Sequence, residues 1–228
     1  MTPVLQASGN ALGNAAKAAL AWTHSARFLT TASRLDQLPA SELPEIAFVG
    51  RSNAGKSTAI NRLAQQKRLA FASRTPGRTQ HINLFEVGPK DAPDALFADL
   101  PGYGYAAVER AAKLRWQEVM ADYLQSRRSL HGVVLMIDSR LGFTDLDRRL
   151  LELLAPRLGG GQVRLLALLT KADKLNRRDA QAALQAAQAL LAEVAPEGAD
   201  IGVTLFSALS RQGLADVAEV LHGWALPS

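Results

Sequence analysis

From residue 44 onward, short apolar runs alternate with longer stretches of helical periodicity. Runs rich in β-branched and aromatic residues predict strands at residues 46–49, 82–87, 95–98, 133–137, 163–169 and 203–206, with an extra edge strand at 28–32. Apolar residues recurring at i, i+3 and i+4 predict helices at 56–66, 109–126, 145–155, 178–194 and 214–225. This alternation is typical of βα units. We therefore expect an α/β fold, with a mostly parallel central sheet and helices on both faces.

Two segments lack this alternation. Residues 1–26 are rich in alanine, and we expect them to form a poorly ordered N-terminal tail ahead of a single domain at 27–228. Residues 69–81 combine turn-forming residues with charge and show no apolar periodicity, which predicts a mobile loop.

Composition excludes several classes of site. The chain has no cysteine, which excludes disulfides, thiolate-bound metals, cysteine nucleophiles and prenyl or palmitoyl anchors. No apolar run approaches the roughly 20 residues of a transmembrane helix. We expect a cytoplasmic monomer without a membrane anchor. The formal charge of +5 suits an anionic partner without naming one.

The segment GRSNAGKS matches the phosphate-binding pattern GxxxxGK[ST] between a predicted strand and a predicted helix. Backbone N–H groups of such a loop point at the β-phosphate, and the helix directs its positive dipole end at the same anion. Lys56 would neutralise β- and γ-phosphate oxygens, and Ser57 would supply a hydroxyl to Mg²⁺. The residues of this loop are Gly50, Arg51, Ser52, Asn53, Ala54, Gly55, Lys56 and Ser57.

A DxxG element follows the predicted strand at 95–98. In it, Asp99 can hold a magnesium-bound water, and Gly102 can offer its N–H to the γ-phosphate. The element comprises Asp99, Leu100, Pro101 and Gly102.

Two later elements select the base. Asp173 has two acceptor oxygens, which match the N1–H and N2 amine that guanine alone among the common bases presents on one edge. Lys171 would lie along the base, and backbone N–H groups after the last predicted strand could reach guanine O6. The residues are Thr170, Lys171, Ala172, Asp173, Phe206, Ser207 and Ala208. All of these elements follow predicted strands, and open α/β sheets bind ligands at that edge.

These motifs, with LPEIAFV at 43–49, TPGRTQ at 75–80 and DLPGYGY at 99–105, resemble the EngB (YsxC/YihA) family of bacterial ribosome-biogenesis GTPases. The resemblance covers roughly residue 28 to the C-terminus. It implies a Ras-like P-loop domain, GTP hydrolysis and a role in maturing the large ribosomal subunit, linked to septation. It also implies that Asn53 matches an asparagine that contacts K⁺ in some related GTPases. The implied switch I segment comprises Gly77, Arg78, Thr79, Gln80 and His81.

The resemblance assigns metal ligation to Ser57, Thr79 and Asp99, and makes Lys56, Thr79 and Gly102 the candidate catalytic residues. Ras-type proteins place a water-orienting glutamine directly after DxxG, where this chain has Tyr103. We therefore expect slow intrinsic turnover that a partner or K⁺ accelerates, with Gln80 as a candidate substitute. Basic residues in or near the switch loops could contact ribosomal RNA phosphates in the GTP state. They are Arg68, Arg74, Arg78, Arg110, Lys113 and Arg115.

Other functions use similar motifs. If the protein is a P-loop ATPase or a small-molecule kinase, its match to the TKAD motif is a coincidence and Asp99 is a Walker-B-type ligand. A membrane-trafficking GTPase would share the pocket, but the chain has no C-terminal cysteine or glycine at position 2 to carry a lipid. A GTP-dependent division scaffold with little catalysis also fits the sequence.

Overall fold

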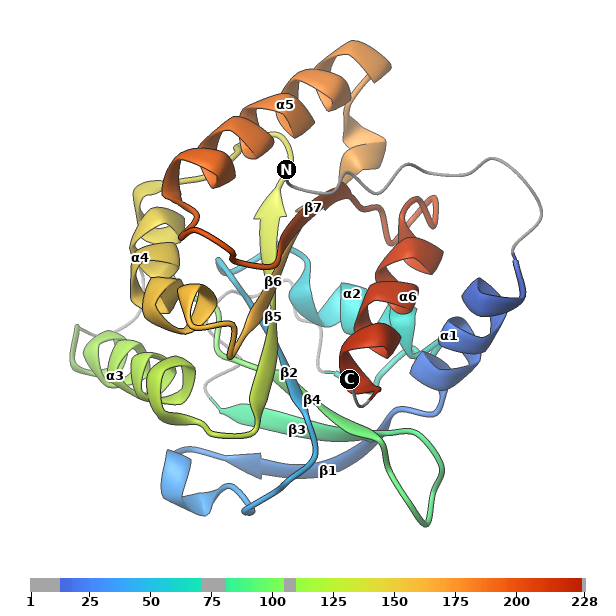
Figure 1. Cartoon of the computed structure of the whole chain (residues 1–228), viewed down its shortest axis with the longest axis vertical. Coiled ribbons are helices and arrows are strands. Elements are labelled where there is room, and N and C mark those ends of the chain that lie inside the picture. Colours follow the sequence, from blue (N-terminus) through green and yellow to red (C-terminus); the bar gives the residue numbers. More distant parts are fainter. Residues whose placement is uncertain (1–12, 71–80, 105–109, 227–228) are drawn as a thin grey trace.

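A seven-stranded sheet forms the centre of the molecule in a computed structural model that describes residues 13–70, 81–104 and 110–226 (Figure 1). The strand order is β1-β3-β4-β2-β5-β6-β7. Neighbours from β4 through β7 pair in parallel, whereas β3 pairs antiparallel with both β4 and β1. The strands are β1 (Arg27–Ala32), β2 (Glu45–Gly50), β3 (Ile82–Val87), β4 (Ala95–Asp99), β5 (Leu130–Asp138), β6 (Arg164–Thr170) and β7 (Ile201–Leu205). The expected mostly parallel sheet and its extra edge strand are confirmed.

Helices cover both faces of this sheet (Figure 1). One face carries α1, α2 and α6 over a core that includes Phe48 and Ile60, and the other carries α3, α4 and α5 over a core that includes Leu135 and Leu154. The helices are α1 (Asn14–His24), α2 (Lys56–Leu63), α3 (Arg110–Ser126), α4 (Asp145–Gly159), α5 (Arg177–Val194) and α6 (Leu214–Ala225), with short 3₁₀ turns η1 (Leu35–Gln37) and η2 (Ala172–Lys174). In the part of the chain that the structure describes, no helix is long and apolar enough to cross a membrane.

The expectation of a poorly ordered tail over residues 1–26 is wrong for Asn14–His24, which form α1. This helix packs against α6 and buries Ala16, Ala19 and Trp22 on one side. The Trp22 ring meets Phe97 edge-to-face at 5.6 Å between ring centroids, and its Nε1 donates to Asp94 Oδ2 at 3.1 Å. The i, i+3, i+6 spacing of these residues is a helical stripe, which the alanine-rich composition obscured. Residues 1–12 lie outside the described part.

The ends of several elements differ from the expected ones. Helix α4 continues past residue 155 and contains Pro156, while α2 ends at Leu63 rather than at residue 66. Strand β7 begins at Ile201 and ends at Leu205, ahead of the expected residue 206. Of the predicted loop at 69–81, residues 71–80 lie outside the described part.

A buried charged group ties α3 to the central strand at the amino edge of the sheet. Glu45, the first residue of β2, is fully buried and accepts hydrogen bonds from the Tyr123 hydroxyl at 2.5 Å and from Ser129 Oγ at 2.9 Å. Its carboxylate also forms an ion pair with Arg127. Because a buried carboxylate without partners is costly, these contacts favour one placement of the end of α3.

The carboxyl ends of the parallel strands meet at the opposite edge. Gly50 pairs with Met136, and Asp138 pairs with Thr170 in the parallel register. Asp99 ends β4 next to β2. The motifs that follow β2, β4 and β6 are therefore neighbours in space, although they are far apart in sequence.

Candidate functional site

The phosphate-loop motif has the expected strand–loop–helix form. The loop leaves β2 at Gly50 and enters α2 at Lys56. Asn53 and Gly55 adopt left-handed backbone conformations, with φ of 67° and 93°. A Cβ on Gly50 would lie 2.7 Å from the Met136 carbonyl oxygen, so this close approach of β2 to β5 requires glycine. The first turn of α2 leaves backbone N–H groups free to bind an anion.

Lys56, Ser57 and Asp99 come together between the loop and the end of β4. The Lys56 ammonium forms an ion pair with Asp99 Oδ1, and both side chains are buried. The Ser57 hydroxyl donates to Asp99 Oδ2 at 3.4 Å. Serine and carboxylate oxygens are the hard donors that Mg²⁺ prefers, so Ser57 and Asp99 fit such an ion.

The DxxG element lies beside the phosphate loop, and backbone hydrogen bonds at Tyr103 join the two. Ser52 N–H donates to the Tyr103 carbonyl at 2.8 Å, and Tyr103 N–H donates to the Gly50 carbonyl at 3.3 Å. A Cβ on Gly102 would lie 3.0 Å from Ser52 Cα, so the contact favours glycine. The side chain of Leu100 is fully buried in the core.

The side chain of Tyr103 is engaged by α4. Its hydroxyl donates to Asp147 Oδ1 at 2.6 Å, while Asp147 Oδ2 accepts from the Thr144 N–H and hydroxyl, each at 2.7 Å. Burial, together with the Asp147 carboxylate, raises the pKa of Tyr103 well above its usual value. Tyr103 is therefore a neutral hydrogen-bond donor that joins the DxxG element to the N-terminus of α4.

The TKAD motif and the residues after β7 form a second part of the site. Asp173 lies in η2, and its Oδ1 accepts from the Ser207 hydroxyl at 2.5 Å. Its Oδ2 lies 3.7 Å from Lys174 Nζ, and the side chain is 16% exposed. A cavity of about 240 Å³ opens beside it, lined by residues that include Gly55, Lys171, Asp173, Phe206 and Ala208. Sequence reasoning missed three lining residues, Thr58, Lys174 and Leu209.

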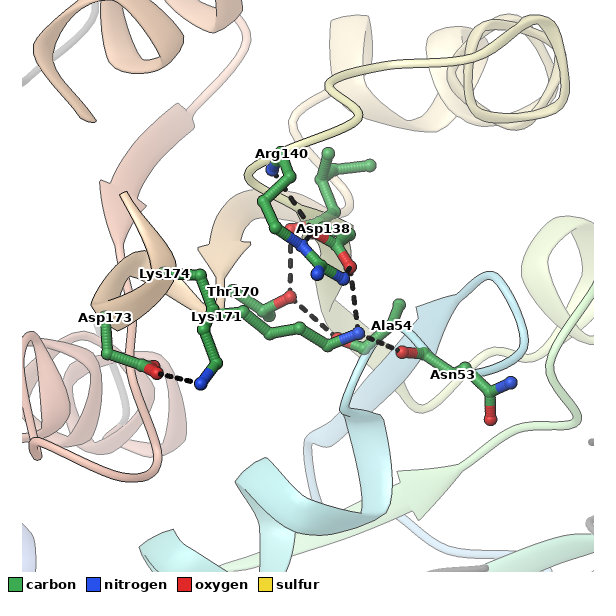
Figure 2. A network of polar contacts seen from close by, with 9 residues as sticks. Asn53, Ala54, Asp138, Arg140, Thr170, Lys171, Asp173 and Lys174 are labelled. Carbon is green, nitrogen blue, oxygen red and sulfur yellow. Dashed lines mark hydrogen bonds and ion pairs between the residues drawn. The ribbon is translucent and has the colours of Figure 1, made fainter. Parts of the chain in front are cut away.

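Lys171 and Thr170 connect this motif to the phosphate loop (Figure 2). The Lys171 ammonium donates to the Asn53 carbonyl and to Asp138 Oδ2, both at 2.8 Å. The Thr170 hydroxyl lies 2.7 Å from the Ala54 carbonyl. These contacts fix the TKAD motif relative to Asn53 and Ala54 of the phosphate loop.

Sequence reasoning also missed Asp138 and Arg140. Asp138 ends β5 at the same sheet edge and accepts from Arg140 Nε at 2.9 Å and Nη2 at 2.7 Å. Burial would raise the pKa of Asp138, but hydrogen bonds from Arg140 and Lys171 outweigh it and hold the pKa well below its usual value. The available signal was position, since Asp138 directly follows the predicted strand at 133–137.

Most of the expected switch I segment, Gly77, Arg78, Thr79 and Gln80, lies outside the described residues. His81 is described directly before β3, where its Nδ1 lies 3.0 Å from Ser33 Oγ. Of the basic residues expected to face RNA, Arg68 is exposed. Arg74 and the side chains of Arg110, Lys113 and Arg115 lie outside the described part.

Comparison with known proteins decides between the nucleotide families. A family profile described as "50S ribosome-binding GTPase" matches residues 45–171. The "Probable GTP-binding protein EngB" of Acidovorax ebreus is 57% identical over 208 residues, which are 91% of this chain and 92% of that protein. The protein of the same name from a Polaromonas species is 57% identical over 93% of this chain and 83% of its own length. This chain belongs to the EngB family of GTP-binding proteins.

Solved structures agree on the fold. A crystal structure of a probable EngB protein has a TM-score of 0.57 at 20% identity, covering 79% of this chain and 98% of that one. A point variant of Aquifex aeolicus Era bound to GDP and AlF₄⁻ has a TM-score of 0.61 at 20% identity, covering 81% of this chain and 57% of that one. The Ras-like GTPase fold and the resemblance to the EngB family are confirmed. Membership of this GTPase family does not support the ATPase or kinase alternative.

Proposed function

We propose that this EngB-family protein is a magnesium-dependent GTP switch that hydrolyses GTP slowly and acts in assembly of the large ribosomal subunit, with a link to septation. One observation carries the nucleotide part of the proposal. Two groups lie on two sides of the phosphate loop, at one edge of the sheet. One is the cluster of Lys56, Ser57 and Asp99, and the other is Asp173, which Ser207 orients beside a cavity. That arrangement suits a ligand with a polyphosphate at one end and a base at the other.

The described residues divide the binding work by position. Lys56 and the N–H groups of the phosphate loop bind phosphate oxygens, and the Gly102 N–H donates to the γ-phosphate. Asp173 accepts from guanine N1–H and N2, with Ser207 holding the carboxylate in place. Ser57 and Asp99, together with Thr79 from outside the described residues, would hold Mg²⁺, which would neutralise phosphate charge. On nucleotide binding, Lys56 exchanges its Asp99 partner for phosphate.

Slow turnover follows from the residue after DxxG. Tyr103 has no side-chain amide to orient a water, and its hydroxyl is already hydrogen-bonded to Asp147. A partner, K⁺ or Gln80 of switch I then completes the catalytic arrangement. Asn53 lies in the loop at the position assigned to K⁺ contact, which predicts faster turnover in potassium than in sodium. Equal rates in the two salts would remove K⁺ from the account.

Ribosome association is proposed from the family description, "50S ribosome-binding GTPase", and from the basic charge of the chain. Switch I and Gly102 contact the γ-phosphate and release it after hydrolysis, which makes association depend on nucleotide state. We further propose that the protein acts as a cytoplasmic monomer.

Two measurements on the full chain test this function. Competition binding should show GTP and GDP displacing a fluorescent guanine nucleotide, whereas ATP and ADP leave it bound. Co-sedimentation with isolated large subunits should be strong with a nonhydrolysable GTP analogue, weak with GDP, and reduced at raised salt because phosphate contacts release counterions. Equal sedimentation in both nucleotide states would refute the switch.

A further inference from the structure

Lys171 separates two cavities at the carboxyl edge of the sheet. On one side lies the cavity of about 240 Å³ beside Asp173. On the other lies a second cavity of about 210 Å³, whose lining includes Arg51, Asn53, Asp138 and Arg140. Lys171 lines both. A long, flexible side chain with open space on two sides needs polar anchors to stay in one rotamer.

The two ends of the Lys171 side chain are constrained differently. Its backbone adopts a left-handed conformation, with φ of 58° and ψ of 31°, which fixes the direction in which the side chain leaves the chain directly before η2. Its ammonium has two described anchors, the Asn53 carbonyl and Asp138 Oδ2, each at 2.8 Å. The side chain remains 32% exposed, so water competes with the neutral carbonyl and the charged carboxylate is the stronger anchor.

Asp138 is itself held rigidly. Arg140 donates to it three times: from the backbone N–H at 3.1 Å, from Nε at 2.9 Å and from Nη2 at 2.7 Å. The Asp138 side chain is only 9% exposed, while that of Arg140 is 49% exposed. Figure 2 shows the carboxylate beside the guanidinium of Arg140 and joined by a dashed line to the ammonium of Lys171. A fork-like arginine contact fixes the plane of the carboxylate and so the point at which the lysine meets it.

We infer that Asp138, clamped by Arg140, is a positioning residue that holds Lys171 as the wall of the base pocket. The inference rests on the proposed guanine site and adds to it a residue of β5 that does not line the cavity beside Asp173. With Asp138 in place, the methylene chain of Lys171 offers an apolar surface to the base while the ammonium stays tied to the phosphate loop. Without Asp138, the lysine is free to turn into the second cavity, and nucleotide binding must restore its position.

A double-mutant cycle tests this coupling directly. The dissociation constant of GDP is measured for the wild-type protein, Asp138→Asn, Lys171→Met and the double variant. Asp138→Asn should weaken GDP binding by on the order of tenfold, the size of one charge-assisted hydrogen bond. In the Lys171→Met background the same change should have almost no effect, because the group through which Asp138 acts is gone.

Controls separate positioning from general damage to the fold. Asp200→Asn makes the same chemical change directly before β7, on a side chain that is 61% exposed, and it should leave GDP affinity unaltered. Inosine diphosphate lacks the N2 amine that faces Asp173. Because Asp138 acts through Lys171 and not through Asp173, Asp138→Asn should weaken the binding of inosine and guanosine diphosphates by the same factor. If Asp138→Asn does not fold, Arg140→Gln, which unclamps the carboxylate at a half-exposed position, replaces it in the cycle with a smaller expected loss.

The outcomes distinguish the two proposals. A wild-type protein that prefers GDP over ADP, with unchanged GDP affinity in Asp138→Asn, would overturn the positioning role alone. Equal losses from Asp138→Asn in the wild-type and Lys171→Met backgrounds would also overturn it, because the effect would not pass through the lysine. A wild type without preference for GDP would overturn the proposed function and, with it, the inference.

Discussion

Tyr103 is the residue from which we propose slow intrinsic turnover. It takes the place directly after DxxG, yet its hydroxyl is hydrogen-bonded to Asp147 and its side chain is buried. The residue thus strengthens the joint between the phosphate loop and α4 rather than supplying a polar group for a water. Slow intrinsic turnover is the consequence that we propose.

Replacing Tyr103 by phenylalanine separates these two roles. The variant loses one buried hydrogen bond to a carboxylate, so we expect its free energy of unfolding to fall by about 2 kcal/mol. Because the hydroxyl is not assigned to catalysis, intrinsic GTP turnover should stay the same. Urea unfolding and single-turnover hydrolysis measure the two quantities. A tenfold loss of turnover with unchanged stability would show that the hydroxyl takes part in hydrolysis.

Asp138 makes a pH-dependent contribution with a definite sign. Its pKa is held below the unfolded value of about 3.9, so the stability that it adds is fully present above that value. That stability is lost as the pH falls through the folded pKa. The difference in free energy of unfolding between wild type and Asp138→Asn should therefore be constant between about pH 8 and 5 and shrink below about pH 4. If the difference in free energy of unfolding changed between about pH 8 and pH 5, the ion-pair account would be contradicted.

At the scale of elements, helix α1 is part of the domain core. Trp22 is 8% exposed, packs on Phe97 of β4 and donates to Asp94. The helix therefore helps to cover the same sheet face as α2 and α6, and its role is structural.

Truncating Trp22 tests that role. Replacing a buried tryptophan by alanine costs about 3 kcal/mol or more, so Trp22→Ala should lower the free energy of unfolding by that amount. Leu226→Ala is a suitable control, since Leu226 is 52% exposed and its loss should cost less than about 0.5 kcal/mol. Chemical denaturation of both variants gives the comparison. Equal stabilities would mean that α1 is not docked as described.

Local patterns predicted the strands, most helices and the order of the motifs, because alternation and glycine-rich loops are properties of neighbouring residues. They failed for α1, because the residues that it buries include alanines, and the alanine-rich segment resembles a poorly ordered tail. They also could not predict the pairing of Tyr103 with Asp147, or of Lys171 with Asp138, because these partners lie 44 and 33 residues apart. Such contacts depend on how parallel strands bring their ends together, which no single segment encodes.

At the scale of the whole molecule, the carboxyl edge of the sheet joins the two halves of the proposed nucleotide site, one for the phosphates and one for the base. Lys171 and Thr170 tie the two halves together through carbonyls of the phosphate loop, those of Asn53 and Ala54. A nucleotide that spans both halves bridges β2, β4, β6 and the loop after β7. In the proposed site, Asp173 is the carboxylate among the described residues that line the cavity, and its two acceptor oxygens would select guanine.

The most direct measurement is base selectivity in wild type and Asp173→Asn. An asparagine amide both donates and accepts, so it matches the N1–H and C2 carbonyl of xanthine rather than the two donors of guanine. The wild type should bind GDP more tightly than xanthosine diphosphate by on the order of a hundredfold or more, and the variant should reverse that preference. An unchanged preference in Asp173→Asn would contradict the account.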